Sequence, residues 1–369
     1  MSTPVETEES AFIYPAHIQE PIPVPERTGL VPFNIHFTDH TAKNIGELQT
    51  LKTEIEAQIS SPNAQVVYFV ENGMLTEPWK AELVKKAREF QGKGSPSPIS
   101  SAHLSVLYYW DCPKNEGRYP TDSEIVVYRE AKRNDPDTAF KIHELEILDE
   151  IAVSKNGHKL FIMEEAMPED EMPILRAEDN EAGEFLVQAA EELKKGDLEK
   201  ALAKTKEALA LDIKIQTRRT LRMVKMLNSI SQKVPTVSYV TGVLGQAHAD
   251  PIINMLNDKF DTTGMKALLG AKAPLDVTAQ FYQDSTVLTC AKDGIKPEEA
   301  VKIVSAKSDD LSVAKILLTE IITNFTNHEV DEVENILKDK MVSIDKVREF
   351  VTLVRSLGLT NAIASLLYF

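Results

Sequence analysis

The pattern of apolar and polar positions predicts alternating strands and helices in the first part of the chain. Apolar and β-branched residues from Gly29 to Phe37 predict a strand. Apolar residues three and four apart between 45 and 59 predict an amphipathic helix. The nearly continuous apolar run from Gln65 to Val70 predicts a strand covered on both faces. A strand-helix-strand unit of this length predicts a parallel pair of strands joined by a right-handed crossover.

The same criteria predict further elements along the chain. Helical spacing occurs at 79–90, 177–228, 297–306, 311–325, 330–339, 343–357 and 361–368, and in a helix that begins at Pro251. Strands are predicted at 159–163 and 237–244. The apolar stretches 104–110 and 125–128 fit either a strand or a buried helix.

These elements predict an α+β fold, with a mixed sheet, flanking helices and a separate helical region at the C-terminal end. Residues 1–30 are an extended arm because their prolines exclude a regular helix. Part of the arm is apolar enough to lie along the fold or along a partner. Residues 31–289 form the predicted α+β domain, with a long helical insertion at 177–232, and residues 290–369 form a helical module.

Composition and charge limit the function. An apolar fraction of 43% and a charged fraction of 27% are typical of a globular protein. The net charge of −16 repels nucleic acids and anionic lipids, so neither is expected as a partner. We expect a cytoplasmic protein without a signal peptide or a membrane span, since no apolar run approaches about 18 residues. The two cysteines, Cys112 and Cys290, form no metal-binding CxxC pair.

Three polar residues lie where predicted strands end. His40 and His248 follow two strands, and Glu71 closes a third. The carboxyl ends of parallel strands meet at one edge of a sheet, where ligands bind in open α/β sheets. Two imidazoles and a carboxylate brought together there can hold a divalent metal ion or perform acid–base catalysis. Alternatively, each residue is an ordinary polar residue of a loop.

Other chemical signatures are absent or incomplete. The sequence has no phosphate-binding GxxxxGK[ST] loop, no dinucleotide-binding GxGxxG and no GxSxG nucleophile elbow. His143 and Glu144 begin like a zinc-binding HExxH helix, but Ile147 replaces the second histidine. His103 lies in an apolar run and is expected to be a hydrogen-bonded core residue.

Two groups of residues resemble the TraB/PrgY/GumN/Tiki domain family, within a wider grouping that includes EreA- and ChaN-like proteins. The first group is the helical segment 218–227 together with the segment 239–248, which ends in Gly245-Gln246-Ala247-His248. The second group is N-terminal and consists of His40, the helix 45–59 and the strand ending at Glu71. The resemblance covers roughly residues 31–260. It implies that His40 and His248 are the two motif histidines, Glu71 the functional glutamate and Arg219 the functional arginine.

The resemblance implies a metal-dependent hydrolase, with peptides or small molecules as substrates. His40, Glu71 and His248 would hold Mn²⁺, Co²⁺ or Zn²⁺, and Arg219 would stabilise an oxyanion. The sequence departs from the family in two places: the first motif has Phe37 in place of glycine, and Arg218 precedes Arg219 where an acid is expected. These departures favour an alternative, a non-catalytic peptide-binding or regulatory protein. Its C-terminal helices would contact a partner or a second copy.

Overall fold

The computed structural model of the chain describes residues 12–16, 22–38, 40, 42–75, 100, 103–104, 108, 120–135, 138–166, 171–195, 197–245, 248–256, 260–263, 344–358, 361 and 365. The helix expected at 79–90, the helices expected between 297 and 339 and both cysteines lie outside these residues. The chain divides into two compact units. The first comprises residues 1–172 and 222–271, and the second comprises residues 173–221 and 272–369.

A mixed six-stranded sheet organises the described part of the first unit, which confirms the α+β fold class. Its strands are β1 (Phe12–Pro15), β2 (Val31–Thr38), β3 (Val66–Leu75), β4 (Leu160–Ala166), β5 (Tyr239–Gly245) and β6 (Phe260–Asp261). Their order across the sheet is β1-β4-β3-β5-β2-β6. All neighbouring strands are parallel except β1, which pairs antiparallel with β4. The apolar part of the N-terminal arm therefore lies along the fold as an edge strand.

The strand order corrects one expectation. The strands β2 and β3 run in the same direction, but they are not neighbours, because β5 lies between them and pairs with both. The connection through α1 (Ile45–Ile59) therefore passes over one strand position. Hydrophobic patterning predicts that a strand is buried but does not select its neighbour. Here the neighbour comes from about 170 residues further along the chain, since Val67 pairs with Val240.

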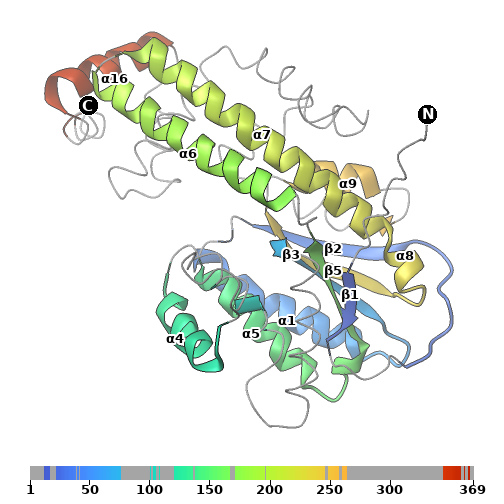
Figure 1. Ribbon diagram of the computed structural model, residues 1–369. Coiled ribbons are helices and arrows are strands. Elements are labelled where there is room, and N and C mark those ends of the chain that lie inside the picture. The colour runs from blue at the N-terminus through green and yellow to red at the C-terminus, as the bar shows by residue number, and fades with distance from the viewer. Residues whose placement is uncertain are drawn as a thin grey trace, which may run out of the picture. The chain divides into compact units, whose positions relative to one another are not determined.

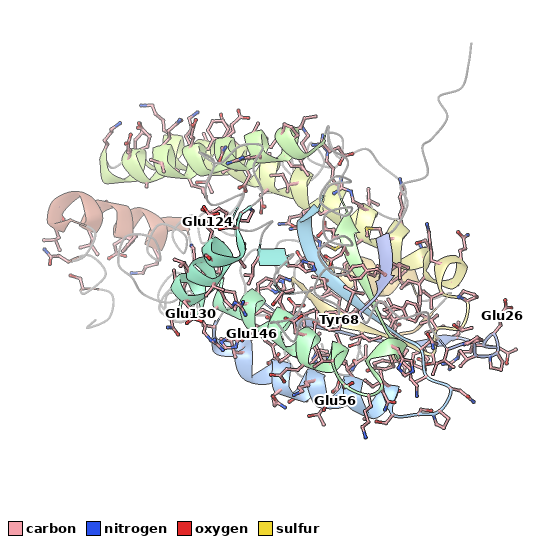
Figure 2. All side chains as sticks on the ribbon, turned by 60° about the horizontal axis from the view of Figure 1, so that its bottom comes forward. Glu26, Glu56, Tyr68, Glu124, Glu130 and Glu146 are labelled. Carbon is pink, nitrogen blue, oxygen red and sulfur yellow. The ribbon has the colours of Figure 1, made fainter. Side chains whose placement is uncertain are left out.

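Helices cover both faces of the sheet (Figure 1). On one face, α1 and α5 (Ala139–Ala152) bury an apolar cluster that includes Leu51 and Leu148, and Figure 2 labels Tyr68 of this cluster. The other face is covered by the end of α7 (Leu198–Asn228), α8 (Ile230–Lys233) and α9 (Ala249–Leu256). Burial on both faces explains why the central strands are almost wholly apolar.

The remaining elements are helical. The 3-10 segments η1 (Ala42–Asn44) and η3 (Gly157–Lys159) precede α1 and β4, and α4 (Asp122–Lys132) shows that the ambiguous stretch 125–128 is a helix. A capping box between Thr121 and Glu124 fixes the start of α4. None of the described helices has an apolar stretch long enough to cross a lipid bilayer.

The described part of the second unit contains most of a long helical hairpin. Its helices are α6 (Glu171–Lys195) and α7, which lie side by side (Figure 1). Glu178 of α6 accepts from both Lys214 and Arg218 of α7, at 2.5 and 2.9 Å. The ammonium group of Lys204 lies 4.8 Å from the ring centroid of Phe185. The same unit contains α16 (Ile344–Leu357), where the sequence predicts a helix at 343–357.

Candidate functional site

The parallel strands β2, β3 and β5 end at one edge of the sheet, as the sequence predicts. His40 lies two residues beyond β2, and His248 lies three residues beyond β5. Glu71 follows Val70, which is the last residue of β3 that pairs in regular register with both neighbouring strands, β4 and β5. The strand itself continues to Leu75, with a register shift beyond Val70, so Glu71 lies within β3 at an irregularity. The structure thus brings residues from three separate segments to the same edge.

Glu71 is the centre of this cluster. Its Oε2 atom lies 3.3 Å from Nε2 of His40 and accepts a 2.5 Å hydrogen bond from the backbone N–H of Gly245. Its Oε1 atom lies 3.6 Å from Nε2 of His248. The side chains of His40, Glu71 and His248 are 28%, 9% and 2% exposed. The outermost group is therefore the imidazole of His40, and the carboxylate lies beneath it.

Thr38 holds His40 in an unusual backbone conformation. His40 has φ = 56°, the one positive φ among the described non-glycine residues. The buried hydroxyl oxygen of Thr38 accepts a 2.8 Å hydrogen bond from the His40 backbone N–H and a 3.1 Å bond from the side chain of Asn44. The His40 ring also packs edge-on against Phe140, with ring centroids 5.4 Å apart. A strained conformation that its surroundings enforce in this way is common at functional sites.

The hydrogen bonding of His40 determines what its ring can do. If Nε2 donates its proton to Glu71, the ring is neutral and Nδ1 carries a lone pair. Nδ1 is buried and has no hydrogen-bond partner among the described residues. A carboxylate that orients a histidine in this way fixes the tautomer and increases the basicity of the other nitrogen. His40 can therefore act as a base or as a ligand through Nδ1.

Two glycines of β5 shape the site, each for a different reason. A Cβ atom on Gly245 would lie 3.5 Å from Oε2 of Glu71 and 3.6 Å from Cδ2 of His248, so a larger side chain there would push into the cluster. A Cβ atom on Gly242 would lie 2.3 Å from the carbonyl oxygen of Phe69 on β3. Gly242 lies inside the strand, where it permits close packing against β3.

The donor types of the cluster suit a divalent metal ion, but their arrangement is that of a hydrogen-bonded chain. Two ligands about 2.1 Å from one tetrahedral ion are about 3.4 Å apart. The 3.3 and 3.6 Å separations of Glu71 from the two histidines are close to this value. Among the described residues, however, no group of three or more His, Cys, Asp or Glu side chains is arranged to hold a metal ion. Binding by all three residues would require the imidazoles to turn.

The structure also describes three polar residues that are not members of this cluster. Arg219 is partly buried on α7 in the second unit, whereas the His40–Glu71–His248 cluster belongs to the first unit. His36 is partly buried and pairs with Glu54 of α1 at 3.1 Å. His103 is a buried, hydrogen-bonded residue, as the sequence predicts, and its Nε2 lies 2.7 Å from Glu164.

Two residues that contact His40 are not predicted from the sequence. Thr38 lies within the first histidine motif, and its hydroxyl group at the end of a strand is the signal that could have identified it. Phe140 carries no such signal, because its position depends on how α5 packs on the sheet.

A second polar group lies on the sheet face that α1 and α5 cover. Tyr68 donates a 2.7 Å hydrogen bond to Glu144, which also accepts a 2.6 Å bond from Lys141. Tyr14 of β1 donates a 3.2 Å hydrogen bond to Glu164 of β4. Burial, and secondarily the neighbouring carboxylates, raises the pKa of Tyr14 and Tyr68 well above 10. Both phenols therefore stay protonated in the folded protein and act as hydrogen-bond donors to carboxylates.

Comparison with known proteins adds no identification. No protein-family model, no curated protein and no solved structure matches the chain.

Proposed function

We propose that the protein is a hydrolase whose active site is the cluster of His40, Glu71 and His248. The observation that supports the proposal is the pairing of His40 with a nearly buried carboxylate, while Nδ1 of the imidazole has no partner in the part of the chain that the structure describes. A carboxylate–histidine pair with one free nitrogen is the arrangement that activates water or another nucleophile in many hydrolases.

The three residues take different roles in this proposal. His40, the most exposed of them, takes a proton from water at Nδ1 after its ring turns to open this buried nitrogen, and returns the proton to the leaving group. Glu71 keeps Nε2 protonated and stabilises the imidazolium that forms. His248 and the backbone N–H of Gly245 hold the two oxygens of Glu71 in place. Arg219 would stabilise the oxyanion, as the resemblance to the TraB/Tiki type implies.

A divalent metal ion is the second way in which the same three residues would activate water. His40, Glu71 and His248 would hold Mn²⁺, Co²⁺ or Zn²⁺, which supplies a bound water of lowered pKa. The same donors hold a proton in the hydrogen-bonded arrangement, so metal binding would compete with protons. Peptides are the first substrates to test, because the family resemblance implies a peptidase.

The first motif lacks the glycine of the family pattern, but its histidine, His40, still contacts Glu71. Phe37, which stands where the family has glycine, lies in β2 opposite Leu244. The backbone of His40 is held instead by the hydroxyl of Thr38. This arrangement supports an active hydrolase over the non-catalytic alternative, which relied on the missing glycine.

The test is a substrate screen followed by a matched pair of variants. Peptides and esters are incubated with Mn²⁺, Co²⁺, Zn²⁺ or a chelator, and the best substrate is used to compare His40→Gln with His36→Gln. Both histidines follow or lie in β2 and pair with a glutamate, at 3.3 and 3.1 Å, but only His40 belongs to the cluster. We expect His40→Gln to lower kcat by about 10²-fold or more and His36→Gln to leave it within about twofold. If no metal supports hydrolysis of any substrate class, the peptide-binding alternative is favoured.

A further inference from the structure

Arg222 of α7 is a buried cation with unused hydrogen-bond donors. Its side chain is 4% exposed, and Nη2 donates to Oε2 of Glu171, the first residue of α6. Nε and Nη1 are enclosed and have no hydrogen-bond partner among the described residues. Buried arginines normally have their donors satisfied, so two orphaned nitrogens on one guanidinium require an explanation.

The shape of the guanidinium group indicates what these donors would bind. The group offers two forks, one formed by Nε and Nη2 and one formed by Nη1 and Nη2, and each fork matches a planar carboxylate. Glu171 accepts from Nη2, and Nη2 belongs to both forks, so a second carboxylate that takes either fork competes with Glu171 for this nitrogen. The net charge of −16 works against the capture of anions in general. A buried arginine with two donors unused among the described residues therefore provides a local, specific attraction for a carboxylate.

Chain connectivity limits how far Arg222 lies from the edge of the sheet that carries the His40–Glu71–His248 cluster. The strand β4, which ends at Ala166, is parallel to β3, so both strands end at that edge. Glu171 is five residues beyond the end of β4, and five residues span at most about 17 Å. Met223 and Val224, which follow Arg222, pack on the sheet face that contains Phe69 and Leu244. Glu171 and Arg222 belong to the same unit as the cluster.

We propose that Arg222 binds a carboxylate of the substrate and that Glu171 occupies the arginine until the substrate arrives. Glu171 suits this role because its side chain is 37% exposed and can swing into solvent. It lies in the first turn of α6, where the helix dipole also favours a carboxylate. The inference extends the proposed hydrolase by naming its substrate class, carboxylate-bearing molecules such as peptides with a free C-terminus.

The experiment measures carboxylate binding without hydrolysis. N-acetylglycine is titrated into the full-length protein by calorimetry at constant ionic strength, in the wild type and in Glu171→Gln and Arg222→Gln. Removing the internal competitor should tighten binding about tenfold in Glu171→Gln, and removing the guanidinium should abolish saturable binding in Arg222→Gln. The matched control is Arg218→Gln, because Arg218 also pairs with a glutamate of α6 but lies in the second unit, and it should bind as the wild type does.

Several outcomes separate this inference from the proposed function. Equal affinity in the wild type, Glu171→Gln and Arg222→Gln overturns the role of Arg222, even if hydrolysis is found. Tighter binding in Glu171→Gln with no hydrolysis supports the carboxylate site and argues against the hydrolase. If Arg222→Gln does not fold, Arg222→Lys keeps the charge but lacks the fork. It should bind at least about tenfold more weakly than the wild type, and unchanged affinity in that variant overturns the proposal.

Discussion

Replacing Gly242 by alanine tests the close packing of β3 against β5, on which the position of the cluster depends. The added Cβ would lie 2.3 Å from the Phe69 carbonyl oxygen and 3.0 Å from the Phe69 nitrogen. Ordinary contacts of a Cβ atom begin near 3.4 Å, so the two backbones would have to separate by about 1 Å. Both contacting atoms belong to the backbone of a paired strand, so no rotation of a side chain can relieve the contact.

The magnitude follows from the cost of overpacking. Inserting a methyl group into a close-packed core typically costs about 1–3 kcal/mol, and a rigid backbone neighbour places Gly242→Ala at the upper end. We therefore expect a loss of about 2–3 kcal/mol in the free energy of unfolding, and a fall in Tm of roughly 5–10 °C. The loss should appear as a lower midpoint of urea unfolding with an unchanged slope.

Gly183→Ala is the matched control. Gly183 is an exposed residue inside α6, and a Cβ atom there would meet nothing within 4 Å. This substitution should stabilise the protein by about 0.5–1 kcal/mol, because alanine has the higher helix propensity. A Gly242→Ala protein as stable as the wild type would refute the close packing of Phe69 against Gly242, and with it the register that places Gly245 beside Glu71.

Three further predictions concern Lys159, the two buried tyrosines and Arg219. Lys159→Met should lower the free energy of unfolding, measured in urea, by about 2 kcal/mol. The reason is that buried Lys159 donates to the carbonyls of Ile59 and Ser61 at the end of α1. An unchanged unfolding midpoint would show that these bonds contribute nothing. The contribution of Tyr14 and Tyr68 to stability should be constant below about pH 10. Above it, stability should fall by about 1.4 kcal/mol per pH unit for each of these tyrosines, because burial raises their folded pKa above the unfolded value. Tyr14→Phe combined with Tyr68→Phe should reduce that slope, and an identical slope would contradict the effect of burial. Arg219→Lys should leave folding intact but lower turnover by about 10²-fold, whereas equal activity would exclude a role in stabilising the oxyanion.

The sequence predicted those features of the fold that depend on local periodicity. The apolar run ending at Val70 and the amphipathic spacing at 45–59 gave β3 and α1, and the strand ends identified the residues that the structure brings together. It did not predict that β5 lies between β2 and β3, since pairing across about 170 residues leaves no local signal. The same limit hid Arg222, whose burial and contact with Glu171 depend on the tertiary packing of α6 and α7.

The resemblance to the TraB/PrgY/GumN/Tiki domains predicts which residues form the site but not their geometry. It implies that His40 and His248 are the two motif histidines. In the structure they differ, because His40 is partly exposed with a positive φ and His248 is almost fully buried. Burial depends on the neighbours that each loop meets, which a short motif does not specify.

We propose above all that Glu71 directs the chemistry of a hydrolytic site. The most direct test compares two glutamates that each contact a histidine. On the best substrate of the screen, kcat/KM is measured for Glu71→Gln and for Glu54→Gln, the partner of His36 outside the cluster. The account predicts that Glu71→Gln loses about 10²-fold or more while Glu54→Gln stays within about twofold of the wild type. Comparable activity of Glu71→Gln and the wild type, with both proteins folded, would contradict the account.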